Sequence, residues 1–271
     1  MCSEAKHVEG GWGGVLDSPP LIAVVEYSIT LLFLVPFAIY DYKRRDIPDK
    51  LVYLFLATSV ILGILAYTDV APALPITAVG LYFFISVVPL PLVLLVLAEL
   101  KLMGFADFFV VLSLSIMYSL PMRYPTLLAS TNIPIPPISF YVLINALILQ
   151  VIVHYSITVA RVLRHGFKPP GGLGVLDKAY LLIAGWPVRV GEVVDKEYYT
   201  PLLVPFEREP GGVEWRITRL TRMEDPGLSS RIREFLERGL ISRDEIIWAS
   251  YGHPLVTYIA VGFIVYILLG V

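Results

Sequence analysis

Two aspartates lie at the edges of long apolar segments, where an ionisable side chain is costly and by default suggests a function. Asp41 ends the first apolar segment and Asp107 begins the fourth. Two carboxyl groups that lie close together do not both ionise easily, so one of them keeps its proton. The ionised group can then take a proton from water while the protonated group polarises a carbonyl. Such a pair could hydrolyse an amide bond without a metal or a nucleophilic side chain.

Each of these aspartates also has a structural interpretation. Asp41 could pair with Arg45 one helical turn later, which contributes only a few tenths of a kcal/mol. A carboxylate at position 107 suits the positive N-terminal end of a helix. The neighbouring Gly104 and Ala106 favour a site, because small residues let backbones approach closely in a membrane and would leave room beside Asp107 for a peptide.

The composition requires a membrane protein. The chain has 271 residues, of which 56% are hydrophobic and 16% charged, with a mean hydropathy of +0.73. Soluble domains carry about a quarter charged residues. The single cysteine, Cys2, excludes an internal disulfide and a Cys-x-x-Cys metal site. We therefore expect no metal and no cofactor.

Six apolar segments are long enough to be candidate membrane spans, although the fourth is short. We expect the third to be kinked at Pro89 and Pro91. The predicted fold is an all-α polytopic membrane protein. Its predicted spans are 21–40, 51–68, 75–98, 107–120, 138–160 and 254–271.

The distribution of Lys and Arg predicts the orientation, because these residues accumulate on the cytoplasmic side. Nineteen of the 21 fall in the segments 41–50, 99–106 and 161–250, and the intervening loops are nearly uncharged. This alternation fits six spans in a multi-pass protein of the cell membrane, with both termini outside. Asp41 and Asp107 would then lie at the same depth, at the cytoplasmic face.

The segment 161–250 differs from the rest of the chain and predicts a small cytosolic α+β insertion before the last helix. We expect strands at 180–185, 188–194 and 213–220, and a helix over 225–240 capped by Ser229 or Ser230. The predicted organisation is a short outer tail (1–20), a five-helix membrane core with both aspartates (21–160), the insertion (161–250) and the sixth helix (251–271).

The remaining polar residues favour structural interpretations. Glu26 lies in the first span, about 22 Å from Asp41 along a helix, and is expected to be a snorkelling or paired acid near the outer interface. Asp46 and Asp49 are interpreted as solvated loop acids, and His154 as a structural histidine. The basic residues of 161–250 alternate with acids, which argues against nucleic-acid binding.

The motifs around the two aspartates resemble those of one family. The stretch YDYKRRDIPDK, with Asp41, the basic pair and Ile47-Pro48, resembles the first motif of the type IV prepilin peptidases. The stretch MGFAD, 103–107, resembles their Gly-x-Gly-Asp motif, with Ala106 in the third position as in the archaeal preflagellin and prepilin peptidases. The resemblance covers the first four spans.

This resemblance implies an intramembrane aspartic endopeptidase. Such enzymes cleave the class III signal peptide of prepilin-like or preflagellin-like precursors, and by the motifs Asp41 and Asp107 would be the catalytic pair. The implied partners are these precursors and membrane lipid, while the oligomeric state is not indicated. Bacterial relatives often add a Cys-x-x-Cys loop and N-methylation, neither of which is expected of a chain whose only cysteine is Cys2.

A second protease family is set aside, and one alternative class stays open. Presenilin-type proteases share a Tyr-Asp motif, as at Tyr40-Asp41, but their Pro-Ala-Leu motif follows the second aspartate, whereas 72–74 precedes Asp107. A non-enzymatic membrane protein, either a transporter or an assembly scaffold, is the other class. A transporter would be expected to carry polar midplane residues and internal repeats, which this sequence lacks.

Overall fold

The computed structural model describes residues 20–100, 103–128, 134–167, 169–171, 173–196, 198–208, 212–218 and 227–270. Most of the predicted tail, 1–20, therefore lies outside the described residues. The chain forms two compact units: unit 1 comprises residues 1–149 and 254–271, and unit 2 comprises residues 150–253. Each unit has its own buried apolar core.

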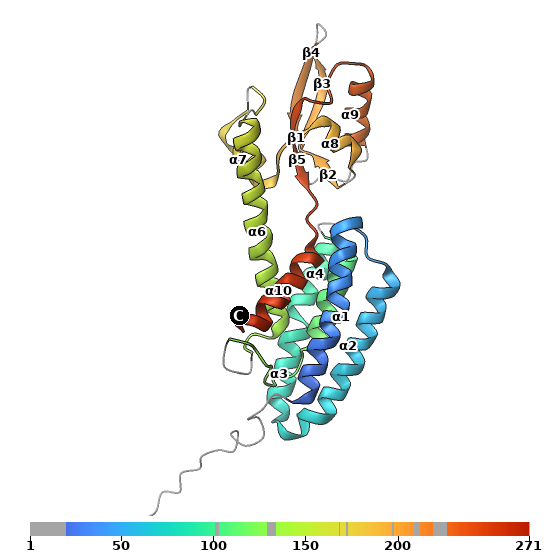
Figure 1. Ribbon diagram of the computed structural model, residues 1–271, viewed down its shortest axis with the longest axis vertical. Coiled ribbons are helices and arrows are strands. Elements are labelled where there is room, and N and C mark those ends of the chain that lie inside the picture. Colours follow the sequence, from blue (N-terminus) through green and yellow to red (C-terminus); the bar gives the residue numbers. More distant parts are fainter. Residues whose placement is uncertain are drawn as a thin grey trace, which may run out of the picture. The chain divides into compact units, whose positions relative to one another are not determined.

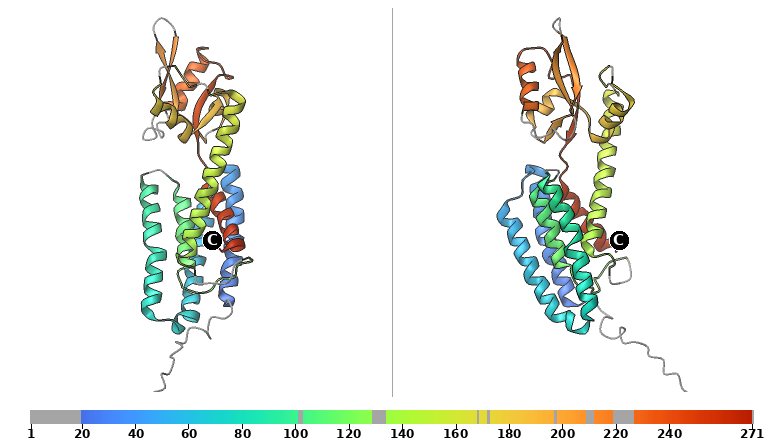
Figure 2. Two further views of the ribbon diagram at one scale, coloured as in Figure 1. Left: turned by 90° about the vertical axis from the view of Figure 1, so that its left-hand side faces the viewer. Right: turned by 180° about the vertical axis from the view of Figure 1, so that it is seen from behind.

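Unit 1 is a bundle of helices that run side by side (Figures 1 and 2). A longer helix, α6 (Ile138–His165), begins in unit 1 and continues into unit 2. The helices of the bundle are α1 (Leu21–Arg44), α2 (Asp49–Val70), α3 (Ile76–Val87), α4 (Pro89–Glu99), α5 (Phe105–Met117) and α10 (Leu255–Leu269), with a 3₁₀ turn, η1 (Ala71–Ala73).

Four helical segments among the described residues are long and apolar enough to cross a membrane: Leu21–Arg44, Asp49–Val70, Ile76–Glu99 and Ile138–His165. The other two predicted spans, 107–120 and 254–271, form the shorter apolar helices α5 and α10. The protein thus has four membrane-spanning candidates by length, and six spans stay a prediction. The third span is interrupted where the kink was expected, because α3 ends at Val87 and α4 begins at Pro89.

Proline and backbone conformation set the ends of the helices that carry the site. Pro48 and Pro254 directly precede α2 and α10, where a missing N–H costs nothing because the first helical amides have no partner within the helix. Arg45 adopts a left-handed conformation with φ 57°, which ends α1. Ile47 is buried in the core of unit 1 and anchors the short segment between α1 and α2.

Unit 2 is an α+β unit with two small antiparallel sheets (Figure 1). One sheet has the strand order β1-β5-β2 and the other pairs β3 with β4. The strands are β1 (Trp186–Arg189), β2 (Tyr199–Pro201), β3 (Leu203–Arg208), β4 (Gly212–Ile217) and β5 (Ile246–Tyr251), and the helices are α7 (Val175–Ala184), α8 (Val190–Asp195) and α9 (Gly227–Glu237).

The predicted secondary structure of this unit needs three corrections. The expected strand 180–185 is the end of helix α7, since a short apolar run fits either structure and only Leu181 is fully buried. The expected strand 188–194 divides into β1 and α8. In the predicted helix, Ser230 donates to the Gly227 carbonyl from inside α9 and does not cap it. Within the expected strand 213–220 the structure has β4, which ends at Ile217, and within the expected helix 225–240 it has α9; residues 219, 220, 225 and 226 lie outside the described residues.

The turn from α7 into β1 depends on a glycine. A Cβ atom added to Gly185 would lie 2.3 Å from the Ala249 carbonyl oxygen and 2.7 Å from a methyl carbon of Leu202. A side chain at this position would therefore separate the start of β1 from its partner strand β5, in which Ala249 is paired with Trp186. The close approach fixes α7 against the sheet of unit 2.

Candidate functional site

The carboxylate of Asp41 is held by a helix from the far end of the chain. Asp41 lies in the last turn of α1, and its Oδ2 accepts a hydrogen bond of 3.0 Å from the backbone N–H of Thr257. The Thr257 hydroxyl lies 3.4 Å from the same oxygen and 3.1 Å from the Ala38 carbonyl. Val256 contributes a further backbone hydrogen bond, and the charge of Arg45 acts on the carboxylate.

These donors belong to the N-terminus of α10, which begins at Leu255. The first amides of a helix have no partner within the helix and carry the positive end of its dipole, so they stabilise a negative charge. The Thr257 hydroxyl also ties α10 to the last turns of α1 through the Ala38 carbonyl. The charged form of Asp41 is therefore stabilised by hydrogen-bond donors from α10, a helix more than two hundred residues later in the sequence.

Asp107 is held by its own chain segment. It lies in the first turn of α5, and its Oδ2 accepts a 3.2 Å hydrogen bond from the backbone N–H of Gly104. A Cβ atom at Gly104 would lie 3.3 Å from this oxygen, which is tighter than most real contacts. The glycine therefore lets the backbone approach the carboxylate closely. The structure thus gives a local reason for Gly104, whereas Ala106 is half-buried and makes no polar side-chain contact.

The two predicted site residues lie within electrostatic range of each other, because the charge of Asp41 acts on the carboxyl group of Asp107. Helix α10 contacts both α1 and α5, the helices that carry the two aspartates. Both side chains are half-buried. The two helices thus carry two carboxyl groups that are partly shielded from solvent, and carboxyl groups of this kind can act as acid and base in hydrolysis.

The structure also shows a residue in contact with Asp41 that the sequence interpretation missed. Thr257 was not among the candidates, because a single threonine near the start of an apolar segment has many structural explanations. The available signal was its position three residues after Pro254, in the first turn of a helix that starts on the same side as Asp41. Its contact with Asp41 depends on tertiary packing.

The acids interpreted as structural lie apart from this pair. Asp46 and Asp49 are exposed. Glu26 is fully buried within unit 1 rather than snorkelling, and one of its oxygens accepts a 3.0 Å hydrogen bond from the Tyr124 hydroxyl. The expectation of a paired acid thus holds for Glu26, with a tyrosine as the partner.

His154 has a neighbour that the sequence did not indicate. Its Nδ1 lies 3.0 Å from Nε2 of His253, and both rings lie against Trp186 in unit 2. A metal site normally needs a third ligand. Across the described residues, no group of three or more His, Cys, Asp or Glu could hold a metal ion.

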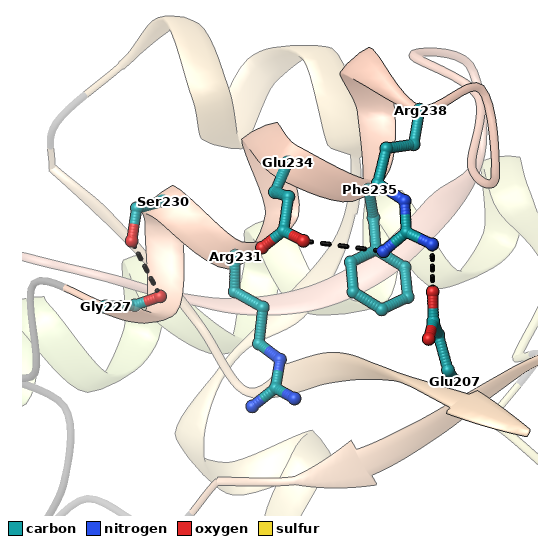
Figure 3. Close-up of a pocket in the computed structure, with 7 residues that line it drawn as sticks. All are labelled: Glu207, Gly227, Ser230, Arg231, Glu234, Phe235 and Arg238. Carbon is teal, nitrogen blue, oxygen red and sulfur yellow. Dashed lines mark hydrogen bonds and ion pairs between the residues drawn. The ribbon is translucent and has the colours of Figure 1, made fainter.

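Unit 2 contains a polar pocket of about 420 Å³ between α9 and the strand β3 (Figure 3). Arg238 pairs there with Glu207 and Glu234, and hydrogen bonding to Glu207 raises the pKa of the Arg238 guanidinium. The guanidinium of Arg231 lies 4.1 Å from the centre of the Phe206 ring. Because the acids are already paired, the pocket has no group poised for acid–base chemistry.

One comparison with known proteins finds a matching family over part of the chain. The model of the family Archaeal Peptidase A24 C-terminus Type II matches residues 177–271, which include most of unit 2 and the helix α10 that holds Asp41. None of the curated proteins matches the chain as a relative. The four apolar helices and this family together indicate a multi-pass membrane protein of the protease class. Over these residues, the match supports the resemblance of the chain to the prepilin peptidase family, in its archaeal branch.

Proposed function

We propose that this protein is an intramembrane aspartic endopeptidase in which Asp41 and Asp107 form the catalytic pair. The observation that supports this proposal is the hydrogen bond from the Thr257 N–H to the Asp41 carboxylate. In addition, the charge of Asp41 acts electrostatically on the carboxyl group of Asp107. The contact of Thr257 links Asp41 to the segment 177–271, which the peptidase family matches. The three other acids considered above, Asp46, Asp49 and Glu26, and the polar pocket of unit 2 offer no comparable pair of carboxyl groups.

The hydrogen bonds favour different roles for the two aspartates. Asp41 accepts from backbone amides at the start of α10 and lies beside the Thr257 hydroxyl, whereas Asp107 accepts from the single amide of Gly104. Donors to a carboxylate stabilise its charged form. Asp41 is therefore the ionised general base, and Asp107 is the protonated general acid.

The reaction then balances without a cofactor. The Asp41 carboxylate takes a proton from water, the water oxygen attacks the scissile carbonyl carbon, and Asp107 gives its proton to the carbonyl oxygen. The proton on Asp41 next passes to the peptide nitrogen as the C–N bond breaks. Asp107 recovers a proton from a hydroxyl of the tetrahedral intermediate. Both aspartates return to their starting states, with one carboxylic acid and one amine as products.

The proposed substrates are prepilin-type and preflagellin-type precursors, in keeping with the family. A basic leader would stay in the cytoplasm and an apolar helix would lie in the membrane, so the cleaved bond would lie at the cytoplasmic face. The last turn of α1 carries Lys43 and Arg44, which fits this orientation because basic residues mark the cytoplasmic side. The N- and C-termini would then both face outward.

The test compares each member of the proposed pair with a matched aspartate of the same chain. Asp41→Asn and Asp107→Asn are expressed separately in membranes and assayed on a tagged prepilin-like substrate, with Asp46→Asn and Asp49→Asn as exposed controls. We expect the first two to abolish cleavage and the controls to cleave normally. A normal rate in either Asp41→Asn or Asp107→Asn would contradict the assignment. Normal function in the cell without any proteolysis would favour the scaffold alternative.

A further inference from the structure

Helix α7 presents an unusual face to its surroundings. Val175, Leu176, Ala179 and Ile183 are the exposed residues of this helix, and all four are apolar. The exposed fractions of Val175, Leu176 and Ile183 are 83%, 85% and 62%. At 3.6 residues per turn these positions fall within about 100° of the helix circumference. They form one continuous apolar stripe, which we call the α7 stripe.

The opposite side of α7 already has a partner. Leu181 is fully buried and packs with Leu202, Leu203 and Trp248 in a core of unit 2, where Val162 of α6 also lies. The orientation of the helix within the unit is therefore fixed by its buried side. Asp177 and Lys178 are half-buried, and neither lies among the exposed positions. The α7 stripe is therefore not the side by which α7 packs against the rest of unit 2.

Helix α9 of the same unit shows what a solvated helix looks like here. Its exposed positions are Gly227, Ser230, Arg233, Glu234 and Glu237, while Ile232 and Phe235 are buried. This is the usual pattern of a surface helix, with apolar residues inside and polar residues outside. In α7, by contrast, the exposed positions are apolar, although the helix belongs to the same folded unit. Its surroundings must therefore differ from those of α9.

The α7 stripe follows in sequence on the exposed apolar surface of a membrane-spanning candidate. Helix α6 is one of the membrane-spanning candidates, and its exposed apolar residues continue as far as Leu163, two residues before it ends. Its 28 residues extend for about 42 Å. This length crosses a hydrocarbon core of about 30 Å and enters the headgroup layer. Val162, which shares a core with α7, lies in this terminal part of α6.

We propose that the α7 stripe docks on the lipid bilayer, with the helix lying in the interface beside the end of α6. Interfacial helices bury an apolar face at the boundary of headgroups and acyl chains and keep charged residues toward the headgroups. Exposed Arg164 precedes the stripe in sequence, and half-buried Lys178 lies within the span of α7 beside it; both suit anionic headgroups. The occupant is thus an anionic lipid surface, and α7 holds unit 2 at the membrane.

The experiment measures the surroundings of single positions and does not depend on proteolytic activity. Cys2 is the only cysteine, so Cys2→Ser provides a cysteine-free background. Leu176→Cys and Ile183→Cys report on the stripe. Glu237→Cys, exposed on α9, is the aqueous control, and Leu147→Cys on the exposed face of α6 is the lipid control. Each variant carries a nitroxide label in the full-length protein, in vesicles of phosphatidylcholine and phosphatidylglycerol.

Collision rates with oxygen, which concentrates in lipid, and with a water-soluble nickel complex are then compared. We expect the oxygen-to-nickel ratio at positions 176 and 183 to be several-fold above that at 237 and to approach that at 147. The ratio should fall when the lipid is phosphatidylcholine alone. Ratios at 176 and 183 equal to that at 237 would overturn the proposal. Spin–spin broadening at these positions would also overturn it, because it would show that a second copy covers the stripe.

Discussion

The two carboxyl groups of the proposed pair are held in different ways. Asp107 binds the amide of Gly104, three residues earlier in its own chain segment, whereas Asp41 binds the start of α10, 216 residues later. The first contact is a property of a short motif, and the second exists only in the folded bundle. The position of the Asp107 carboxyl group is therefore specified by local sequence, whereas that of the Asp41 carboxyl group depends on the placement of a separate helix, α10.

The largest expected effect comes from removing either carboxyl group. Asp41→Asn and Asp107→Asn should each reduce cleavage by more than about a thousandfold, since an amide can neither accept a proton from water nor donate one as an acid. Initial rates on a tagged precursor in membranes measure this loss. A small loss in either variant would contradict the assignment of that aspartate to the catalytic pair.

A smaller effect on the cleavage rate is expected from a side chain at Gly104, which would crowd the carboxyl group of Asp107. Gly104→Ala places a Cβ about 3.3 Å from Oδ2 of Asp107, so the carboxyl group must move by a few tenths of an ångström. We expect cleavage to fall about tenfold, equivalent to about 1.4 kcal/mol of barrier. Gly80→Ala is the control, because a Cβ at Gly80 meets no atom within 4 Å. Equal rates in the two variants would contradict a role for Gly104.

Substitutions of Thr257 test the contact between α10 and Asp41. Thr257→Val removes a hydroxyl and keeps the backbone N–H, so we expect a loss of about fivefold, as for one hydrogen bond of about 1 kcal/mol. The charged form of Asp41 becomes less favourable, so the acid limb of the pH–rate profile should move to higher pH. Thr257→Ser keeps the hydroxyl and should restore both the rate and the profile. An unchanged profile in the valine variant would count against the proposed base.

The smallest effect on cleavage is expected at Glu26, the buried acid of the same helix as Asp41. Glu26→Gln keeps an acceptor for the Tyr124 hydroxyl and should leave the cleavage rate unchanged. Glu26→Leu leaves that hydroxyl without its partner, which costs about 1–3 kcal/mol of stability. Thermal unfolding in detergent measures the second variant. Lost cleavage in a stable Glu26→Gln protein would extend the site beyond the two aspartates.

The same contrast between local and distant interactions explains what the sequence could predict. Apolar length and the charge of the loops predicted the helices around Asp41 and Asp107, because both signals are local. The contact with Thr257 was not predictable, because nothing near Asp41 in the sequence indicates which helix lies beside it. In unit 2, the short run 180–183 fits a strand or a helix equally well, and its packing around Leu181 decides the outcome.

The most direct test of a shared site is a double-mutant cycle on Asp41 and Asp107. Cleavage rates are measured for Asp41→Asn, Asp107→Asn and the double variant in the same membranes. Residues that act as one catalytic unit are not additive, so the double variant should be no slower than the slower single variant. Losses that multiply in the double variant would mean that the two aspartates act independently, and would contradict the proposed pair.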